Sequence, residues 1–428
     1  MRMAGSACGR FRIRWTWLAP TVAATNALVW TVSLVISNTS ARPQQVLGEF
    51  LSTTAIILFS SNLILVTRAR PLERGFGGLD KLFASHRADG IIGALIITAH
   101  FLVIPKSAGL VPSKPFGYVA IAWVLVTVLV AAAPRTPWRN LVPLPYHHWK
   151  FLHRFNGVLV ALAATHSLLA PTVVRTNAIL IVWVYGVVSA GLAAYLYREF
   201  LFPRVGPFRS LRIHAVRPLT DRVTELKLDP IDAAAFQRRA GQFAFVSMSG
   251  GLSGEQHPFT ISSPPNEAVR FSIKASGDWT DELATKPPPA GAAARIEGPY
   301  GCFDYRLGRR RQLWLAGGVG ITPFAAMLPE VDPSYSVLLV WSVREPDGAF
   351  YRAELEMAVA ERPNVRLMIH PTSAKGHLSI ADLDVGDLHR GVSAFICGPT
   401  AMRRAFIEQL RALGMPRREI FFEEFTLR

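Results

Sequence analysis

The chain has 428 residues, half of them hydrophobic, and a formal net charge of +16. This length predicts two or three domains, and the basic excess raises the question of nucleic-acid binding. Apolar residues come in long blocks up to about residue 200, and most cationic residues of that region lie in the short connections between blocks. Membrane topology therefore explains the charge better than a nucleic-acid partner does. Cys8, Cys302 and Cys397 are too few and too scattered for a disulfide framework or a zinc site.

Six apolar segments of the first half reach or approach the roughly 20 residues that a membrane helix requires. The predicted spans are Trp15–Ile36, Leu47–Thr67, His86–Ile104, Phe116–Ala133, Phe151–Leu169 and Ala178–Leu196. The third and fourth are short. A basic stretch precedes the first segment without a clear small-x-small cleavage site, so we interpret it as the start of an uncleaved helix.

The distribution of lysine and arginine sets the orientation of these segments. Cationic residues gather before the first span, between the second and third, between the fourth and fifth, and after the sixth. The other connections hold only Arg42, Lys106, Lys114 and Arg175. Because cytoplasmic loops carry the positive excess, both termini are predicted to face the cytoplasm and the protein to lie in the cell membrane.

Two of the predicted spans contain two histidines each. These are His86 and His100 in the third span, and His153 and His166 in the fifth. Ionisable residues inside a membrane are costly and are functional candidates. At about 1.5 Å per residue, the two histidines of each span are separated by roughly 20 Å along the helix. Both spans run in the same direction, so we expect His86 and His153 near the cytoplasmic side and the other two near the outer side.

Histidines paired at two depths suit two haems, whose iron takes an axial ligand from each face. On an ideal helix of about 100° per residue, His153 and His166 point about 140° apart, so a π-bulge or strong tilt is expected between them. The alternative is that each histidine only hydrogen-bonds a neighbouring helix. His147 and His148, in the basic loop before this span, are expected at the membrane interface or facing the propionates rather than as ligands.

The second half begins with short β-branched runs between close turn signals, the pattern of a small antiparallel barrel. In its motif "HPFTISSPP", Phe259 offers a flavin an aromatic face, Thr260 a hydroxyl near the reactive ring nitrogen, and His257 a donor for phosphate. Further on, "IKASGDWT" offers Lys274 and the Gly277–Thr280 turn for the pyrophosphate. Alone, "FTIS" is an ordinary strand.

The remaining sequence repeats strand, glycine-rich turn and helix, beginning with "RQLWLAGGVGITPFAAML". Gly318 and Gly320 remove side chains where the backbone must approach a phosphate. Thr322 is predicted to be the helix N-cap and Pro323 the first helical residue. The helix N-terminus would then favour an anionic pyrophosphate.

Two later strand ends carry further candidates. Ser342 and Arg344 follow the next strand, where a doubly wound fold meets the adenosine ribose and an arginine accommodates a 2′-phosphate; a surface charge is the alternative for Arg344. Cys397 and Gly398 end a later strand beside the expected nicotinamide, although Cys397 could equally be a buried small residue.

The fold class is therefore multi-domain. We expect a six-helix transmembrane haem bundle at 1–205, an antiparallel β-barrel FAD domain at 206–306, and a doubly wound α/β NAD(P)-binding domain at 307–428. With four such histidines, "HPFTISS", "GPYG", "LAGGVGITPF" and "CGPTAM" in this order, the chain resembles the ferric reductase and NADPH oxidase superfamily. Its soluble half is similar to a ferredoxin–NADP⁺ reductase module.

The resemblance implies two b haems, FAD and NADPH, with NADH possible. His86 and His153 would hold the inner haem, and His100 and His166 the outer one. The other implied cofactor contacts are His257, Pro258, Phe259 and Thr260 for FAD, Gly318, Gly320, Thr322 and Pro323 for the nicotinamide cofactor, and Cys397, Gly398 and Pro399 of "CGPTAM". Candidate catalytic residues are Thr260, Cys397 and, near the flavin ring, Phe425 of "FFEEFTLR".

The sequence departs from the animal oxidases of this superfamily, which carry another histidine where Ile104 stands. It has no EF-hand signature, so no calcium-binding module is expected. The predicted activity is transmembrane electron transfer from NADPH to an extracytoplasmic acceptor, either O₂ or a ferric chelate. Alternatives are an electron-relay subunit that serves a partner protein, and a reductase with an inert six-helix anchor.

Overall fold

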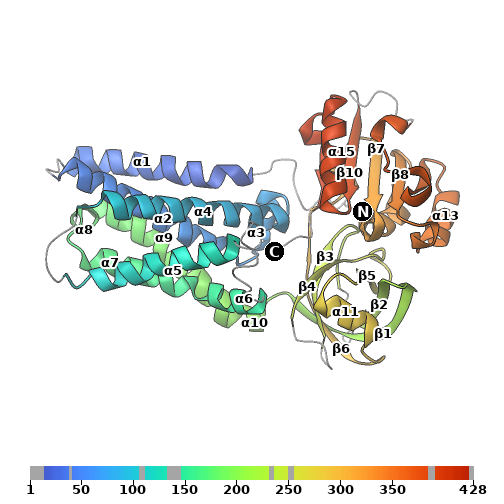
Figure 1. Ribbon diagram of the computed structural model, residues 1–428, viewed down its shortest axis with the longest axis horizontal. Coiled ribbons are helices and arrows are strands. Elements are labelled where there is room, and N and C mark those ends of the chain that lie inside the picture. Colours follow the sequence, from blue (N-terminus) through green and yellow to red (C-terminus); the bar gives the residue numbers. More distant parts are fainter. Residues whose placement is uncertain are drawn as a thin grey trace. The chain divides into compact units, whose positions relative to one another are not determined.

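The computed structural model describes residues 14–37, 41–105, 111–132, 146–230, 236–248, 255–383 and 391–423. They fall into two compact units (Figure 1). The first is helical and ends at Val205, and the second begins at Gly206 and contains two β-sheets.

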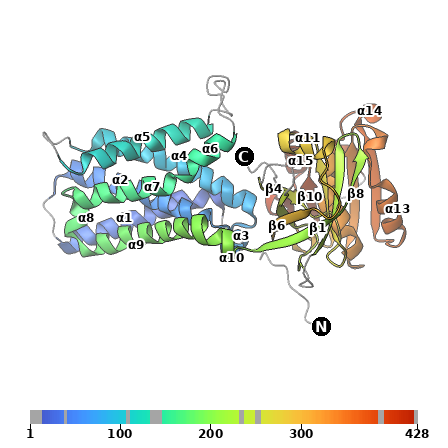
Figure 2. The same cartoon turned by 90° about the horizontal axis from the view of Figure 1, so that it is seen from below.

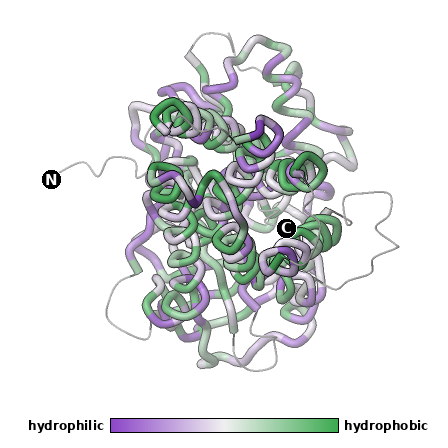
Figure 3. The backbone as a smooth tube through the Cα atoms, turned by 90° about the vertical axis from the view of Figure 1, so that its left-hand side faces the viewer, coloured by the Kyte–Doolittle hydropathy of each residue, from purple (hydrophilic) through white to green (hydrophobic). Residues whose placement is uncertain are grey.

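The helical unit is a bundle of long helices lying side by side (Figures 1 and 2). Its long helices are α1 (Leu18–Ser37), α2 (Pro43–Leu65), α4 (Leu79–Val103), α5 (Lys114–Ala132), α7 (Asn156–Leu169) and α9 (Ala178–Leu196). Its short helices are α3 (Arg70–Phe76), α6 (Tyr146–Arg154), α8 (Val173–Thr176) and α10 (Phe202–Val205). Among the described residues five helices are long and apolar enough to cross a membrane, namely α1, α2, α4, α5 and the helix that begins with α9. Seen nearly end-on, the bundle is coloured mostly as hydrophobic (Figure 3).

Helix α2 is the most buried of these five, and it contacts α1, α7 and α9. A polar cluster joins it to its neighbours. The buried amide of Asn26 in α1 donates to Thr53 and Thr54 of α2 at 3.0 and 2.8 Å, and Trp183 of α9 donates to Asn26 Oδ1 at 3.1 Å. Between apolar helices in lipid, such hydrogen bonds add to close packing as the source of association.

The fifth predicted span differs from the expected single helix. The chain leaves the helix at Phe155 (φ −78°, ψ 2°), so that His153 lies in α6 and His166 in α7. A turn at Phe155 stands where a π-bulge was expected, so the π-bulge is wrong at this place, while the alternative of a strong tilt stays a prediction. A π-helical turn does occur at Tyr197–Leu201, where α9 passes into α10.

The third predicted span is also longer than expected. Helix α4 has 25 residues and begins at Leu79, seven residues before the predicted start at His86. Its first turns carry Asp80, Lys81 and Arg87. Because these residues are charged, the apolar content of the sequence does not reveal this part of the helix. His86 consequently lies well inside the helix.

The first sheet is a closed antiparallel barrel. Its strands are β1 (Phe208–Thr220), β2 (Val223–Pro230), β3 (Phe243–Met248), β4 (His257–Thr260), β5 (Val269–Lys274) and β6 (Ala293–Tyr300), in the order β4-β3-β6-β1-β2-β5. Ile261, just after β4, forms an antiparallel bridge with Phe271 of β5. This bridge joins the two edges, and the barrel core fills with apolar side chains from both. Helix α11 (Asp278–Thr285) follows β5.

The second sheet is parallel and has helices on its faces, the doubly wound arrangement expected for a nucleotide domain. Its strands are β7 (Arg311–Gly317), β8 (Ser336–Val343), β9 (Val365–Pro371), β10 (Val392–Cys397) and β11 (Ile420–Phe422), in the order β11-β10-β7-β8-β9. The helices are α12 (Thr322–Met327), α13 (Arg352–Ala360), α14 (Thr372–Lys375) and α15 (Thr400–Ala412). The strand order reverses between β7 and β10, and open α/β sheets bind ligands at such a switch point.

Candidate functional site

The outer histidines of the helical unit are both anchored by backbone carbonyls. His100 Nδ1 lies 2.7 Å from the carbonyl oxygen of Gly48, and His166 Nδ1 lies 2.8 Å from that of Ser113. A carbonyl can only accept, so both Nδ1 atoms carry the proton and the lone pair of each neutral ring lies on Nε2. This is the arrangement in which a histidine is prepared to bind a metal through Nε2.

The inner histidines face each other. The rings of His86 and His153 lie 5.9 Å apart between centroids, at an interplanar angle of 80°. His86 Nδ1 is buried and has no hydrogen-bond partner, whereas His153 Nδ1 lies 3.1 Å from the amide nitrogen of Asn156. Trp123 Nε1 donates to the oxygen of the same amide at 3.1 Å. The two predicted pairs thus differ in how the protein holds them.

In the part of the chain that the structure describes, His86 and His153 form a pair rather than part of a larger cluster of possible metal ligands. Within the described ranges, no group of three or more His, Cys, Asp or Glu side chains comes together. Two ligands per site fit an iron whose other positions belong to a porphyrin. At Gly117 of α5 a Cβ would lie 2.8 Å from His166 Nδ1, so the backbone of α5 passes against this ring. The adjacent rings of His86 and His153 and the carbonyl-bonded Nδ1 atoms of His100 and His166 fit haem ligation, and a ring contact between His100 and His166 stays a prediction.

The flavin candidates lie on β4 and around it. His257, Pro258 and Phe259 are half-buried and Thr260 is buried. Trp279 of α11 packs against this strand, with its ring 4.7 Å from that of His257 and stacked 5.7 Å from that of Phe259. The indole N–H of Trp279 is buried without a partner. An aromatic cradle with an unused donor fits a flavin nucleotide.

The residues expected at the pyrophosphate form the start of α11. Lys274 is exposed at the end of β5, and Gly277 precedes the first residue of the helix. Thr280 Oγ1 accepts the N–H of Ser276 and donates to the Gly277 carbonyl, both at 2.8 Å. Thr280 therefore shapes the turn, while the Lys274 ammonium is accessible to an anion.

In the nucleotide domain, the loops after β7 and β10 touch through their backbones. A Cβ on Gly320 would lie 2.3 Å from the carbonyl oxygen of Cys397 and 2.8 Å from Cα of Gly398. Gly318 has φ +53°, and a Cβ there would meet nothing within 4 Å. Trp341 of β8 donates to the Gly318 carbonyl at 2.9 Å. Gly320 therefore permits a tight crossing of the two loops at the switch point, and Gly318 faces open space. Pro399, which follows Gly398, is exposed.

Two details of this region correct the sequence prediction. A 3₁₀ turn at Gly318–Ile321 precedes α12, so Thr322 is the first helical residue and Pro323 the second. Thr322 is not the N-cap, since its hydroxyl donates to the Val319 carbonyl at 3.0 Å. At the end of β8, Ser342 is half-buried and Arg344 is exposed, so the Arg344 guanidinium is accessible to a ligand.

Cys397 is a free, buried thiol at the end of β10. Its burial, and then the nearby Glu423 carboxylate, raise the pKa of Cys397, so the side chain is a neutral thiol at physiological pH. Glu423 follows β11 and lies against Gly301 of the barrel, where a Cβ would be 2.9 Å from Glu423 Oε1 and 3.1 Å from the Phe243 ring. Phe243 in turn pairs with Thr260. A chain of contacts thus brings Thr260 and Cys397 into one neighbourhood.

Trp279 and Glu423 were not among the predicted site residues. Trp279 stands inside the quoted "IKASGDWT", and a large aromatic residue beside a phosphate turn was an available signal. Glu423 stands in "FFEEF", where an acidic residue interrupts an apolar strand. The other C-terminal candidate, Phe425, lies outside the described residues.

Two family models match the second unit. Residues 209–303 match an FAD-binding domain, and residues 314–407 match an oxidoreductase NAD-binding domain. The barrel and the parallel sheet are therefore an FAD-binding domain followed by an NAD-binding domain.

Relatives extend this assignment. The heavy chain of a superoxide-generating NADPH oxidase from Dictyostelium discoideum is 28% identical over 294 residues, which cover 60% of this chain and 53% of the relative. A putative respiratory burst oxidase homolog protein G from Arabidopsis thaliana is 26% identical over 168 residues, covering 35% of this chain and 19% of the relative. These matches support the resemblance of the chain to the ferric reductase and NADPH oxidase superfamily.

A third relative is a carnitine monooxygenase reductase subunit from Escherichia coli, 25% identical over 226 residues, which cover 51% of this chain and 68% of the relative. The match spans about half the length of the Dictyostelium relative. The shared chemistry is that of an NAD(P)H-dependent flavin oxidoreductase.

The position of Thr260 yields a test. Thr260→Ala should slow anaerobic flavin reduction by NADPH more than it weakens FAD retention, because it removes a hydroxyl but keeps the strand and its aromatic neighbours. Single-turnover kinetics and flavin content measure the two effects. Thr285→Ala, which removes an exposed hydroxyl of α11, is the control. Unchanged single-turnover kinetics in Thr260→Ala would contradict a role at the flavin ring.

Proposed function

We propose that this protein transfers electrons from NADPH on the cytoplasmic side of a membrane, through FAD and two b haems, to an acceptor on the other side. The acceptor is O₂ or a ferric chelate. The observation that carries the proposal is the joint presence of an FAD- and NAD-binding reductase and of His86 and His153, whose rings lie 5.9 Å apart in a unit of apolar helices. When bound, FAD accepts a hydride and the haems carry single electrons, while the protein positions and tunes them.

Each part of the chain has a role in this proposal. His86 with His153, and His100 with His166, would hold the haems, and the Gly48 and Ser113 carbonyls orient the outer pair. The apolar segments support six spans, with α6 and α7 together forming the fifth. The charge of the loops supports cytoplasmic termini.

On the reductase side, Phe259 and Trp279 would hold the flavin, with Thr260 at the reactive edge of its ring. The Gly318 and Gly320 loop would bind the dinucleotide. The neutral thiol of Cys397 would pack beside the nicotinamide without adding a charge. Glu423, which approaches both Cys397 and the barrel, is a carboxylate close to this contact.

The nature of the acceptor separates two candidate functions. The Dictyostelium relative carries the description superoxide-generating, which supports O₂. The monooxygenase reductase among the relatives supports an electron-relay role that serves a partner protein. NADPH-driven turnover of the purified chain with O₂ and with ferric chelate, each with and without superoxide dismutase, distinguishes them. No turnover without a partner would favour the relay.

The histidine assignment predicts the haem content. His100→Ala or His166→Ala should remove one haem equivalent per chain and leave flavin reduction by NADPH intact. Haem-to-protein ratios from absorbance spectra measure the loss. His148→Ala, at an exposed histidine of α6, is the matched control and should keep both haems. Two haems retained in His100→Ala or His166→Ala would refute the assignment.

Arg344 predicts the choice of nicotinamide cofactor. Its planar, permanently charged fork can engage a ribose 2′-phosphate through two hydrogen bonds. Hydrogen bonds to charged groups contribute about 1.5–3 kcal/mol, so Arg344→Ala should raise the KM for NADPH about tenfold or more and barely change that for NADH. Arg366→Ala, at an exposed arginine of β9, is the control. Equal losses for both cofactors would mean that Arg344 only supports the fold.

A further inference from the structure

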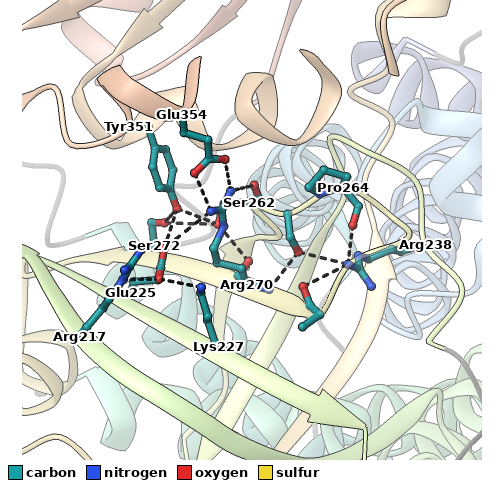
Figure 4. A network of polar contacts seen from close by, with 12 residues as sticks. Arg217, Glu225, Lys227, Arg238, Ser262, Pro264, Arg270, Ser272, Tyr351 and Glu354 are labelled. Carbon is teal, nitrogen blue, oxygen red and sulfur yellow. Dashed lines mark hydrogen bonds and ion pairs between the residues drawn. The ribbon is translucent and has the colours of Figure 1, made fainter. Parts of the chain in front are cut away.

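The barrel and the nucleotide domain are joined by a buried polar network centred on Arg270 of β5 (Figure 4). The neighbours of Arg270 along the strand, Val269 and Phe271, belong to the barrel core, so the Arg270 side chain points out of the barrel. It lies over the ring of Tyr351 at 4.6 Å and donates two hydrogen bonds to the carboxylate of Glu354, at 2.6 and 2.8 Å. Both partners belong to the start of α13 in the nucleotide domain.

On the nucleotide-domain side of this contact, Tyr351 is part of the hydrophobic core of that domain. Tyr351 is buried with Trp341 and Leu355 in that core, and its ring packs against Phe350. Its hydroxyl reaches back into the barrel, where it hydrogen-bonds Ser272 and lies 3.3 Å from Ser262 Oγ. The contact therefore ties two cores together through a few directional bonds.

The barrel side of the contact lies just after β4, which carries the flavin candidates Phe259 and Thr260 and is called the flavin strand below. The Arg270 guanidinium donates to the Ser262 carbonyl at 2.9 Å, and the Ser262 N–H donates to the Arg270 carbonyl at 2.7 Å. Ser262 stands two residues after Thr260. Arg238 holds the following loop by donating to Ser263 Oγ and to the Pro264 carbonyl. Arg270 is thus bonded to the flavin strand on one side and to the nucleotide domain on the other.

A buried carboxylate completes the network. The side chain of Glu225 in β2 is fully buried and is bonded to Arg217 at 2.7 Å, with Arg270 at 3.8 Å. A charge in this position costs less when it is paired and hydrogen-bonded. The carboxylate helps to fix the direction in which the Arg270 fork points.

We propose that Arg270 is a positioning residue for hydride transfer, which fixes the nucleotide domain, through Glu354 and Tyr351, at the distance and angle from the flavin strand that the reaction requires. The proposal rests only on the flavin reductase half of the proposed function. Hydride transfer is sensitive to geometry, and a displacement of about 1 Å can cost 10²-fold in rate. A loosened link should therefore slow the hydride step more than it weakens the binding of either FAD or NADPH.

The test uses the full chain in detergent with its bound FAD. Flavin reduction by NADPH is followed anaerobically in single turnovers, with NADPH deuterated at the transferred position as a second substrate. We expect Arg270→Met to lower the limiting rate about tenfold or more, with a larger isotope effect, and to keep FAD content and NADPH affinity within about twofold. Arg270→Lys, which keeps the charge but loses the two-pronged contact, should fall between.

Glu354 provides a second route to the same conclusion. Its side chain is 40% exposed, so Glu354→Ala should fold even where Arg270→Met does not. It should slow flavin reduction, and the double variant should be no slower than Arg270→Met, because both remove one link. Arg309→Met is the matched control: its pair with Glu419, at 3.0 Å, lies within the nucleotide domain and should leave the rate unchanged.

The outcomes separate the alternatives. A native limiting rate in Glu354→Ala overturns the proposal, as does a loss of FAD that parallels the loss of rate, since that result means Arg270 only supports the barrel. The readout precedes any transfer beyond the flavin. Absence of haem or of an extracytoplasmic acceptor would refute the proposed function and leave this test intact.

Discussion

The closure of the barrel beside β4 is the constraint on which the reductase unit depends. Strand β4 has only four residues, and the bridge between Ile261 and Phe271 seals the barrel directly after it. The residue before each member of this bridge, Thr260 before Ile261 and Arg270 before Phe271, makes different contacts. Thr260 ends the strand that packs against Trp279, and Arg270 reaches the second domain. A shift in the register between β4 and β5 would move both Phe259, a flavin candidate, and Arg270, which contacts the nucleotide domain.

The long elements could be predicted because their pattern is local. Helix α9 begins and ends where the apolar run predicts, since nothing interrupts that run. Helix α4 could not be delimited, because its charged first turns look like a connection. Asn156 and Gly157, a dipeptide typical of turns, directly follow Phe155, but they stand at the start of a long apolar run, so the run was interpreted as one helix.

Residues of the candidate site could be predicted where a short sequence motif has a direct physical reason. The structure brings His86 and His153 together, and it places Gly320 of the loop after β7 against the loop after β10. The cofactors that these residues and the "HPFT" strand would bind stay predictions. Arg270, Trp279 and Glu423 were not identified, because their contacts join positions far apart in the chain. Arg270 and Glu354 are 84 residues apart, and nothing in "VRFSIK" distinguishes this arginine from one that faces solvent.

The unequal support of the two histidine pairs has a consequence for adaptation. The outer histidines are held by the carbonyls of Gly48 and Ser113, which belong to the backbone and are the same whatever side chain is attached. His153 is held by the side-chain amide of Asn156, which a single substitution can remove. The surroundings of His153 can thus change by point mutation, whereas the carbonyls beside His100 and His166 stay in place unless the backbone of their helices moves.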